Sequence, residues 1–184
     1  LNGRLYSEMH AKEYYENFVL KQGFSHVLTS LDSLRLENDI VVVEGAGSPS
    51  EINIAKYDIA NMLLAKKVGA PVIIVADIER GGCFASIVGT MMLLKLVHKR
   101  LVSGFLINKF RGDITILAPA IKEVQKMIKK RIIGVVPKID HDLPVEDSLD
   151  GGNSNGYSVT GSSEFLQESW NRHIDHIAEA IKEN

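Results

Sequence analysis

The chain has few cysteines, no long apolar stretch and no evident signal peptide. Cys83 is the only cysteine in 184 residues, which excludes an internal disulfide and a cysteine-based zinc site and is typical of proteins from the reducing cytoplasm. The longest apolar stretches, such as 68–76, are far shorter than the ~20 residues that cross a bilayer. No signal peptide is evident in the first residues. We therefore expect a cytoplasmic protein without a membrane partner.

The chain also lacks an excess of charge of either sign. Twenty-one lysines and arginines stand against 23 aspartates and glutamates, for a formal net charge of -2. A chain this balanced has no general field that would gather nucleic acid or an anionic membrane, so any recognition must depend on local sites. Its length and its 45% hydrophobic content are enough for one ordinary domain with a buried core.

Four short β-rich runs are present, at 40–43, 72–75, 102–107 and 132–136. These runs are continuous and do not alternate between apolar and polar residues, which is typical of strands buried on both faces. Segments with helical spacing lie around them, and the sequence predicts helices over 11–36 with a possible break at Gly23, 59–65, 84–94 and 119–128. This alternation predicts an α/β fold, in which a parallel sheet is joined by right-handed crossovers and has helices on both faces.

The composition changes after this region. A stretch rich in glycine, serine and asparagine lies between 147 and 163, so we expect residues 1–149 to form the main domain and 150–163 to form a linker. Leu166, Trp170 and Ile174 then recur at four-residue steps, which predicts a carboxyl-terminal amphipathic helix over 164–184.

The first predicted strand ends in an acidic residue followed by small residues, Glu44 and 45–48. Ligands of open parallel sheets bind beyond the carboxyl ends of the strands. A carboxylate there can hold Mg²⁺, and small residues let backbone N–H groups approach a phosphate or carboxylate. A solvated Glu44 in a tight turn fits the spacing equally well, and Ser48 with Glu51 can form a helix capping box.

The second predicted strand ends in Asp77-Ile78-Glu79-Arg80-Gly81-Gly82. An arginine can hold a carboxylate or a phosphate through two hydrogen bonds, and two glycines at a helix start expose backbone donors. The alternative interpretation is a glycine turn with a surface arginine. Cys83 follows directly, and we expect it to be a small packing residue instead of a nucleophile.

The third and fourth predicted strands also end in polar residues. Asn108 and Lys109 follow the third strand, where an amide can bind the edge of a purine and the lysine can cover its face. Asp113 can simply cap the segment that follows. After the fourth strand comes an acidic loop with prolines, 136–148, for which the pattern indicates no specific role.

Taken together, these segments resemble one family. The strings VVVEGAGSPSEIN, DIANM, VIIVADIERGGCFASIVGT, GFLINKFRGD, GVVP and LPVEDSL, in this order and at these intervals, closely resemble the synthetase domain of the cobyric acid synthases, over about residues 1–149. The resemblance implies a P-loop NTPase-like fold shared with dethiobiotin synthetase. It also implies that ATP and Mg²⁺ phosphorylate side-chain carboxylates of a corrinoid, adenosylcobyrinic acid diamide, and that ammonia from glutamine then replaces the phosphate to form an amide in cobalamin biosynthesis.

The resemblance also implies roles for individual residues. Glu44 would bind the metal and, with Asp77, act in catalysis. The nucleotide would lie against Gly45, Ala46, Gly47, Asn108 and Lys109. The residues expected to face the carboxylates of the corrinoid are Ser48, Glu51, Asn53, Arg80, Gly81, Gly82 and Arg111.

Two features of the family are missing from this sequence: a Gly-Lys-Ser/Thr phosphate loop on its own strand, and a glutaminase domain with a nucleophilic cysteine. Leu1 also matches an internal position of the family. We therefore expect partners that supply the phosphate-loop segment and the glutaminase in cis or in trans, with homo-oligomerisation as a further possibility. The alternatives are a split-enzyme subunit, a non-catalytic corrinoid- or nucleotide-binding module, and a dethiobiotin-synthetase-like carboxylate-activating enzyme, which SPSEIN and ERGG disfavour.

Overall fold

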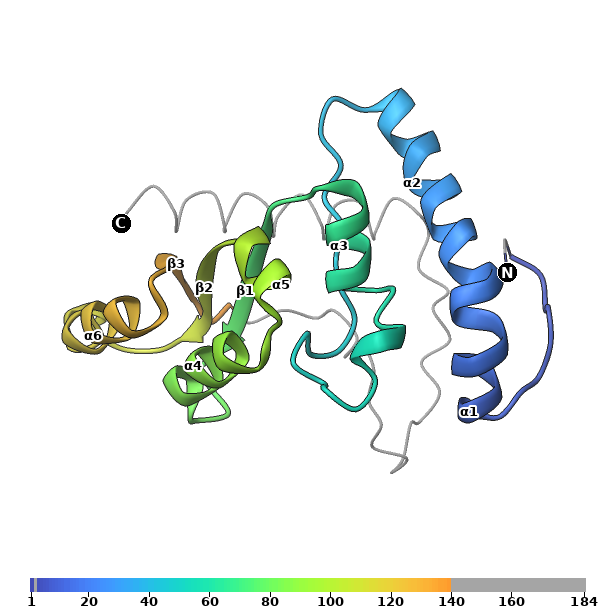
Figure 1. Cartoon of the computed structure of the whole chain (residues 1–184). Helices are drawn as coiled ribbons and strands as arrows, with labels where there is room; N and C mark the ends of the chain where they lie inside the picture. The colour runs from blue at the N-terminus through green and yellow to red at the C-terminus, as the bar shows by residue number, and fades with distance from the viewer. Residues whose placement is uncertain (2, 140–184) are drawn as a thin grey trace, which may run out of the picture.

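The computed structural model describes Leu1 and residues 3–139 (Figure 1). The predicted linker at 150–163 and the predicted helix at 164–184 lie outside the described residues, as does the end of the predicted main domain. No helix in the described part of the chain is long and apolar enough to cross a membrane.

The amino-terminal part is one continuous helical run, made of α1 (Ala11–Glu13), the π-helical η1 (Tyr14–Gly23) and α2 (Phe24–Glu37). The predicted break at Gly23 is wrong, because its φ of -53° and ψ of -46° are helical. Glycine here leaves space for a neighbouring side chain. A Cβ atom at this position would lie 3.1 Å from Cε1 of Phe18, so the aromatic ring packs directly on the bare helix backbone.

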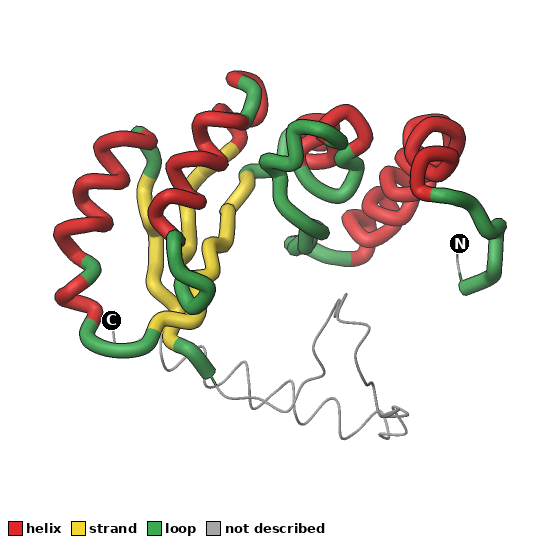
Figure 2. The backbone as a smooth tube through the Cα atoms, turned by 90° about the horizontal axis from the view of Figure 1, so that it is seen from below, coloured by secondary structure: helices red, strands yellow, loops and turns green. Residues whose placement is uncertain are grey.

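The sheet has three parallel strands in the order β1 (Val72–Asp77), β2 (Val102–Phe110) and β3 (Arg131–Pro137). Helices flank it, so the predicted class of a parallel α/β sheet is confirmed. Helices α4 (Cys83–Leu93) and α6 (Ala118–Ile128) contact each other as well as the sheet (Figure 2). The remaining helices are η2 (Ala55–Tyr57), α3 (Met62–Val68), α5 (Leu96–Leu101) and η3 (Ile114–Ile116).

The core lies between the sheet and these helices. Phe105 and Ile107 of β2 are fully buried at 0% exposure, and Ile87 of α4 is buried at 1%. The sequence also predicts Met92 as an inward residue, but its side chain is 72% exposed. Ile87 and Met91 are four positions apart and share the inner face of α4. Met92, the residue after Met91, points about 100° away from that face around the helix axis.

The first predicted strand, at residues 40–43, is absent from the structure, and this expectation is wrong. Residues 40–43 form no strand, and the side chains of Ile40 and Val42 are 81% and 89% exposed. β1 pairs with β2 alone in the described sheet, so its other edge has no hydrogen-bonded neighbour. A strand exists only through pairing with another strand, and no described segment pairs with residues 40–43.

Candidate functional site

The register of the sheet brings the ends of the three strands to one edge. Asp77 of β1 lies opposite Asn108 of β2, and Phe110 of β2 lies opposite Pro137 of β3. The backbone N–H of Lys138 continues the pairing by donating to the carbonyl of Phe110 at 2.8 Å. We call the polar residues at this edge the rim: Asp77, Glu79, Arg80, Asn108, Lys109, Arg111 and Lys138.

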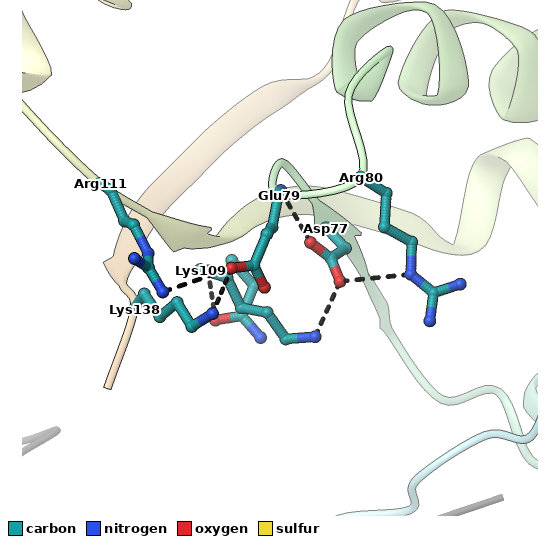
Figure 3. A network of polar contacts seen from close by, with 7 residues as sticks. Asp77, Glu79, Arg80, Lys109, Arg111 and Lys138 are labelled. Atoms are coloured by element: carbon teal, nitrogen blue, oxygen red, sulfur yellow. Dashed lines mark hydrogen bonds and ion pairs between the residues drawn. The ribbon is translucent and has the colours of Figure 1, made fainter. Parts of the chain in front are cut away.

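Asp77 is held by donors from two strand ends (Figure 3). Its Oδ2 accepts a hydrogen bond from Nζ of Lys109 at 2.8 Å, and its Oδ1 accepts one from the backbone N–H of Glu79 at 2.9 Å. Nε of Arg80 lies 3.9 Å from the same Oδ2. The hydrogen bond from Lys109 lowers the pKa of Asp77 below its ordinary value. Both carboxylate oxygens therefore already have protein partners, and this aspartate fixes the position of Lys109.

Glu79 makes the second link across the rim. Its Oε1 pairs with Nζ of Lys138 from the end of β3 and lies 3.5 Å from NH2 of Arg111 (Figure 3). The Lys138 contact is the main cause of a lowered pKa for Glu79. The sequence did not predict Glu79 or Lys138 as site residues, although each comes one or two positions after a strand. That position was the signal that could have identified them.

The rim carries an excess of positive charge. The side chains of Arg80, Lys109, Arg111 and Lys138 face the two carboxylates of Asp77 and Glu79. Arg80 and Arg111 are 88% and 65% exposed, so their guanidinium groups remain accessible. An arrangement of this kind is suited to binding an anion with several carboxylates or phosphates.

Local backbone geometry shapes the same edge. Gly81 and Gly82 have φ of 75° and 66°, values that glycine adopts without the steric cost paid by other residues, and Gly82 immediately precedes α4. The prediction of a glycine turn into a helix is therefore confirmed. Lys109 has φ of 61°, and its N–H donates to Oδ1 of Asn108 at 2.9 Å. The Nδ2 group of Asn108 makes no hydrogen bond within the described residues.

The structure brings Arg80 and Asn108 together around Asp77, whereas Glu44 lies in another loop and makes no described contact with them. Glu44 follows no strand, and together with Val41, Val42 and Val43 it lines a hydrophobic groove against η1 and α2. None of the rim residues lines this groove. In the described part of the chain, no hydrogen bond or ion pair joins Glu44 to the rim.

The residues after Gly47 form turns. The hydroxyl of Ser48 lies 2.8 Å from that of Ser50, and the N–H of Glu51 donates to the carbonyl of Ser48 at 3.4 Å. The predicted capping box is wrong, because no helix begins here and the next helical residue is Ala55. Asn53, the other residue expected to face the substrate, is exposed in the same run of turns.

Two predicted local roles are confirmed elsewhere. Asp113 caps η3 by accepting at Oδ1 from the N–H and the hydroxyl of Thr115, both at 2.8 Å. Cys83 is buried in the core, and burial raises the pKa of its thiol. A buried thiol with a raised pKa is a poor nucleophile, so Cys83 serves packing.

The described residues contain no group of three or more His, Cys, Asp or Glu side chains that could hold a metal ion by themselves. Mg²⁺ in phosphoryl-transfer sites is usually held by one or two carboxylates together with waters and the phosphates of the substrate. Glu44 is exposed and makes no ion pair with a described residue. It therefore fits the part of a single carboxylate ligand, whereas the oxygens of Asp77 are engaged.

Comparison with known proteins identifies relatives of the chain. A family model described as "AAA domain" matches residues 4–143. A "Probable cobyric acid synthase" of Thermococcus kodakarensis is 56% identical over 126 residues, which cover 68% of this chain and 26% of the relative. The "Cobyric acid synthase" of Caldanaerobacter subterraneus is 48% identical over 147 residues, covering 80% of this chain and 28% of the relative.

The "Cobyric acid synthase" of Clostridium novyi is 47% identical over 149 residues, which cover 80% of this chain and 29% of the relative. The chain thus spans less than a third of the length of these relatives. No solved structure matches it. With its motifs, its parallel sheet and these matches, the chain belongs to the AAA domain family and is a homologue of part of the cobyric acid synthases.

Proposed function

We propose that the chain carries the nucleotide- and corrinoid-binding part of a cobyric acid synthase, which uses ATP to amidate side-chain carboxylates of a corrinoid with ammonia derived from glutamine. The observation that carries this proposal is the rim, where four cationic side chains face two carboxylates at the carboxyl edge of a parallel sheet. This is the edge at which open α/β sheets bind their ligands. The similarity to cobyric acid synthases supports the choice of a polycarboxylate substrate.

The chemistry asks for two kinds of binding group. A carboxylate is a poor acceptor for ammonia, so one of its oxygens first attacks the γ-phosphorus of ATP and ADP leaves. Ammonia then adds to the acyl phosphate carbon, and inorganic phosphate departs to leave the amide. The exposed guanidinium groups of Arg80 and Arg111 would hold the substrate carboxylates, and the Nδ2 group of Asn108 would contact the nucleotide base. Mg²⁺, held by Glu44 with Gly45, Ala46 and Gly47 near the phosphates, would offset the negative charge of the transfer.

We further propose that another part of the enzyme, in cis or in trans, supplies a strand that pairs beside β1, together with the glutaminase. Among the described residues, β1 has no strand at its outer edge and residues 40–43 pair with no strand, which supports this. Ile73 and Val75 of β1 are 50% and 57% exposed, and an exposed apolar edge strand readily takes a further strand. The short match to the relatives, 26% to 29% of their length, is consistent with such a partner.

Corrinoid binding by the 184-residue chain tests the role of the rim. Replacing Arg111 by alanine should weaken binding of adenosylcobyrinic acid diamide about tenfold, because one charge-assisted hydrogen-bonding group to a carboxylate is lost. Titration followed by calorimetry gives the Kd. The matched control is Arg131→Ala, since Arg131 is an exposed arginine at the opposite end of β3. Equal Kd values for the wild type and both variants would exclude the rim as the corrinoid site.

A further inference from the structure

In the described part of the chain, one asparagine side chain makes a hydrogen bond to the loop that carries Glu44. The Nδ2 group of Asn61 donates a hydrogen bond to the carbonyl of Ala46 at 2.7 Å, across a separation of 15 residues. Within the described residues this is the hydrogen bond that ties residues 44–47 to another element. The position of the loop therefore depends on where the amide of Asn61 is held.

That amide is fixed by Asp58. A second hydrogen bond from Nδ2 of Asn61 reaches Oδ1 of Asp58 at 2.8 Å, and the backbone N–H of Asn61 donates to the same oxygen at 3.0 Å. The other carboxylate oxygen accepts from the N–H of Met62 at 3.2 Å. Both hydrogens of the amide are thus used on oxygen acceptors, and a flipped amide would place its own oxygen against them. Met62 is 2% exposed in the core, so the chain of contacts runs from the loop to the core.

The loop also approaches Asn61 so closely that a Cβ atom at position 45 would force the amide of Asn61 to shift. A Cβ atom at Gly45 would lie 2.0 Å from Oδ1 of Asn61, far inside van der Waals contact. Gly45 does not have a positive φ, so its backbone would accept alanine. The requirement for glycine therefore comes from the side chain of Asn61 and not from the conformation of the loop.

We propose that Asn61, oriented by Asp58, is a positioning residue that holds residues 44–47 in place and thereby sets the position of the Glu44 carboxylate. This rests on the proposed function, in which Glu44 binds Mg²⁺. Asn61 acts through a hydrogen bond to Ala46 and through close packing on Gly45. It does not itself contact the reacting groups.

The first test measures motion of the loop in the 184-residue chain, independently of activity. In Asn61→Ala, backbone ¹⁵N order parameters of residues 45–47 should fall from about 0.85, the value of rigid backbone, to below about 0.6. Asn38→Ala is the matched control. The Nδ2 group of Asn38 also donates to a backbone carbonyl, that of Leu34 at 2.9 Å, but within α2 and its end. Order parameters that stay unchanged in Asn61→Ala would overturn the proposal.

The second test uses the close approach. Gly45→Ala alone should lower the Tm by about 2–4 °C, because its new Cβ meets Oδ1 of Asn61. In the Asn61→Ala background that oxygen is gone, and the nearest backbone atom, the carbonyl oxygen of Ala60, is at an ordinary 3.5 Å. The same substitution should then cost less than half as much, a non-additive double-mutant cycle. Strict additivity would contradict the contact.

The third test connects the loop to function. In a complete synthase containing this chain, Asn61→Ala should raise the Mg²⁺ concentration for half-maximal ATP turnover about tenfold, as loss of a group that orients a metal ligand does, while the KM for corrinoid stays unchanged. A mobile loop with an unchanged Mg²⁺ requirement would overturn the positioning role. Failure of the proposed function itself would be seen separately, in the corrinoid titration of Arg111→Ala.

Discussion

The rim and the loop after residues 40–43 both follow apolar runs in the sequence, yet the structure builds them in different ways. At the rim, paired strands fix Asp77 opposite Asn108, and ion pairs join the ends of all three strands. The loop at 44–47 follows an unpaired segment and is held by the side chain of Asn61. At the rim, many backbone hydrogen bonds and ion pairs together position the functional groups. In the loop at 44–47, one side chain does so.

The difference follows from where each segment stands in the sheet. β2 has a neighbouring strand on either side, so its backbone groups are paired, and Phe105 and Ile107 are fully buried in the core with Ile87 of α4. Residues 40–43 have equally apolar side chains, but no described strand offers them hydrogen bonds. An apolar run therefore favours a buried strand, but the strand forms only where a neighbouring element pairs with it or packs on it.

The largest effect is expected for Glu44, in the loop that no strand pairing holds in the described part of the chain. Glu44→Gln in a complete synthase should lower Mg²⁺-dependent ATP turnover by more than about 100-fold, because the metal supplies several kcal/mol of charge stabilisation. Steady-state ATP hydrolysis coupled to amidation measures this. Asp77→Asn is the comparison, since the oxygens of Asp77 already have protein partners, and it should lose less. A near-normal rate in Glu44→Gln would exclude the metal role.

The next largest effect is a difference in the free energy of unfolding between substitutions in β2 and in residues 40–43. Phe105→Ala should lower the free energy of unfolding of the chain by about 3–5 kcal/mol, because a fully buried ring is replaced by a cavity. Val42→Ala should change it by less than about 0.5 kcal/mol, because that side chain is 89% exposed. Urea unfolding followed by circular dichroism measures both. A loss above about 2 kcal/mol for Val42→Ala would show that residues 40–43 are packed in the isolated chain.

The smallest effect concerns the ion pair at the rim. Asp77→Asn should lower the free energy of unfolding at neutral pH by about 0.5–1 kcal/mol, as is usual for a partly exposed pair. Because the pKa of the folded carboxylate lies below its ordinary value of 3.8, Asp77 binds fewer protons folded than unfolded. Its contribution is therefore complete above about pH 4 and is lost as pH falls through the lower folded pKa.

Unfolding of the wild type and Asp77→Asn at a series of pH values tests this, with Asp32→Asn, at a position of α2 with no ion pair among the described residues, as the control. The difference between the wild type and Asp77→Asn should shrink below pH 3.8, whereas the control should show no such change. A difference that grows at acid pH would contradict the assigned direction of the pKa.

Much of the fold was predictable because local patterns and pairing agree. The runs that became β1, β2 and β3, and the helix starting near Pro119, were found from continuous apolar character and from proline in a first turn. At the start of α3, Asp58 accepts the N–H groups of Asn61 and Met62, which is also a local interaction. The sequence signal for each of these features lies within a few residues.

The rest could not be predicted because it depends on distant partners. Gly23 was expected to interrupt a helix, but it makes room for Phe18. Ser48 and Glu51 have the spacing of a capping box without a helix to cap. Lys138 belongs to the rim only because β3 lies beside β2 and brings it to Glu79 across 59 residues of sequence.

The sequence by itself determined the family, the three paired strands and the groups that end them, because apolar runs and strand-end motifs are local and specific. Only the tertiary structure decided which of those groups meet. Parallel register places Asp77, Asn108 and Lys138 along one edge, because hydrogen bonds between strands fix their ends relative to each other. The loop that carries Glu44 is instead hydrogen-bonded to the amide of Asn61, because no described strand lies beside residues 40–43.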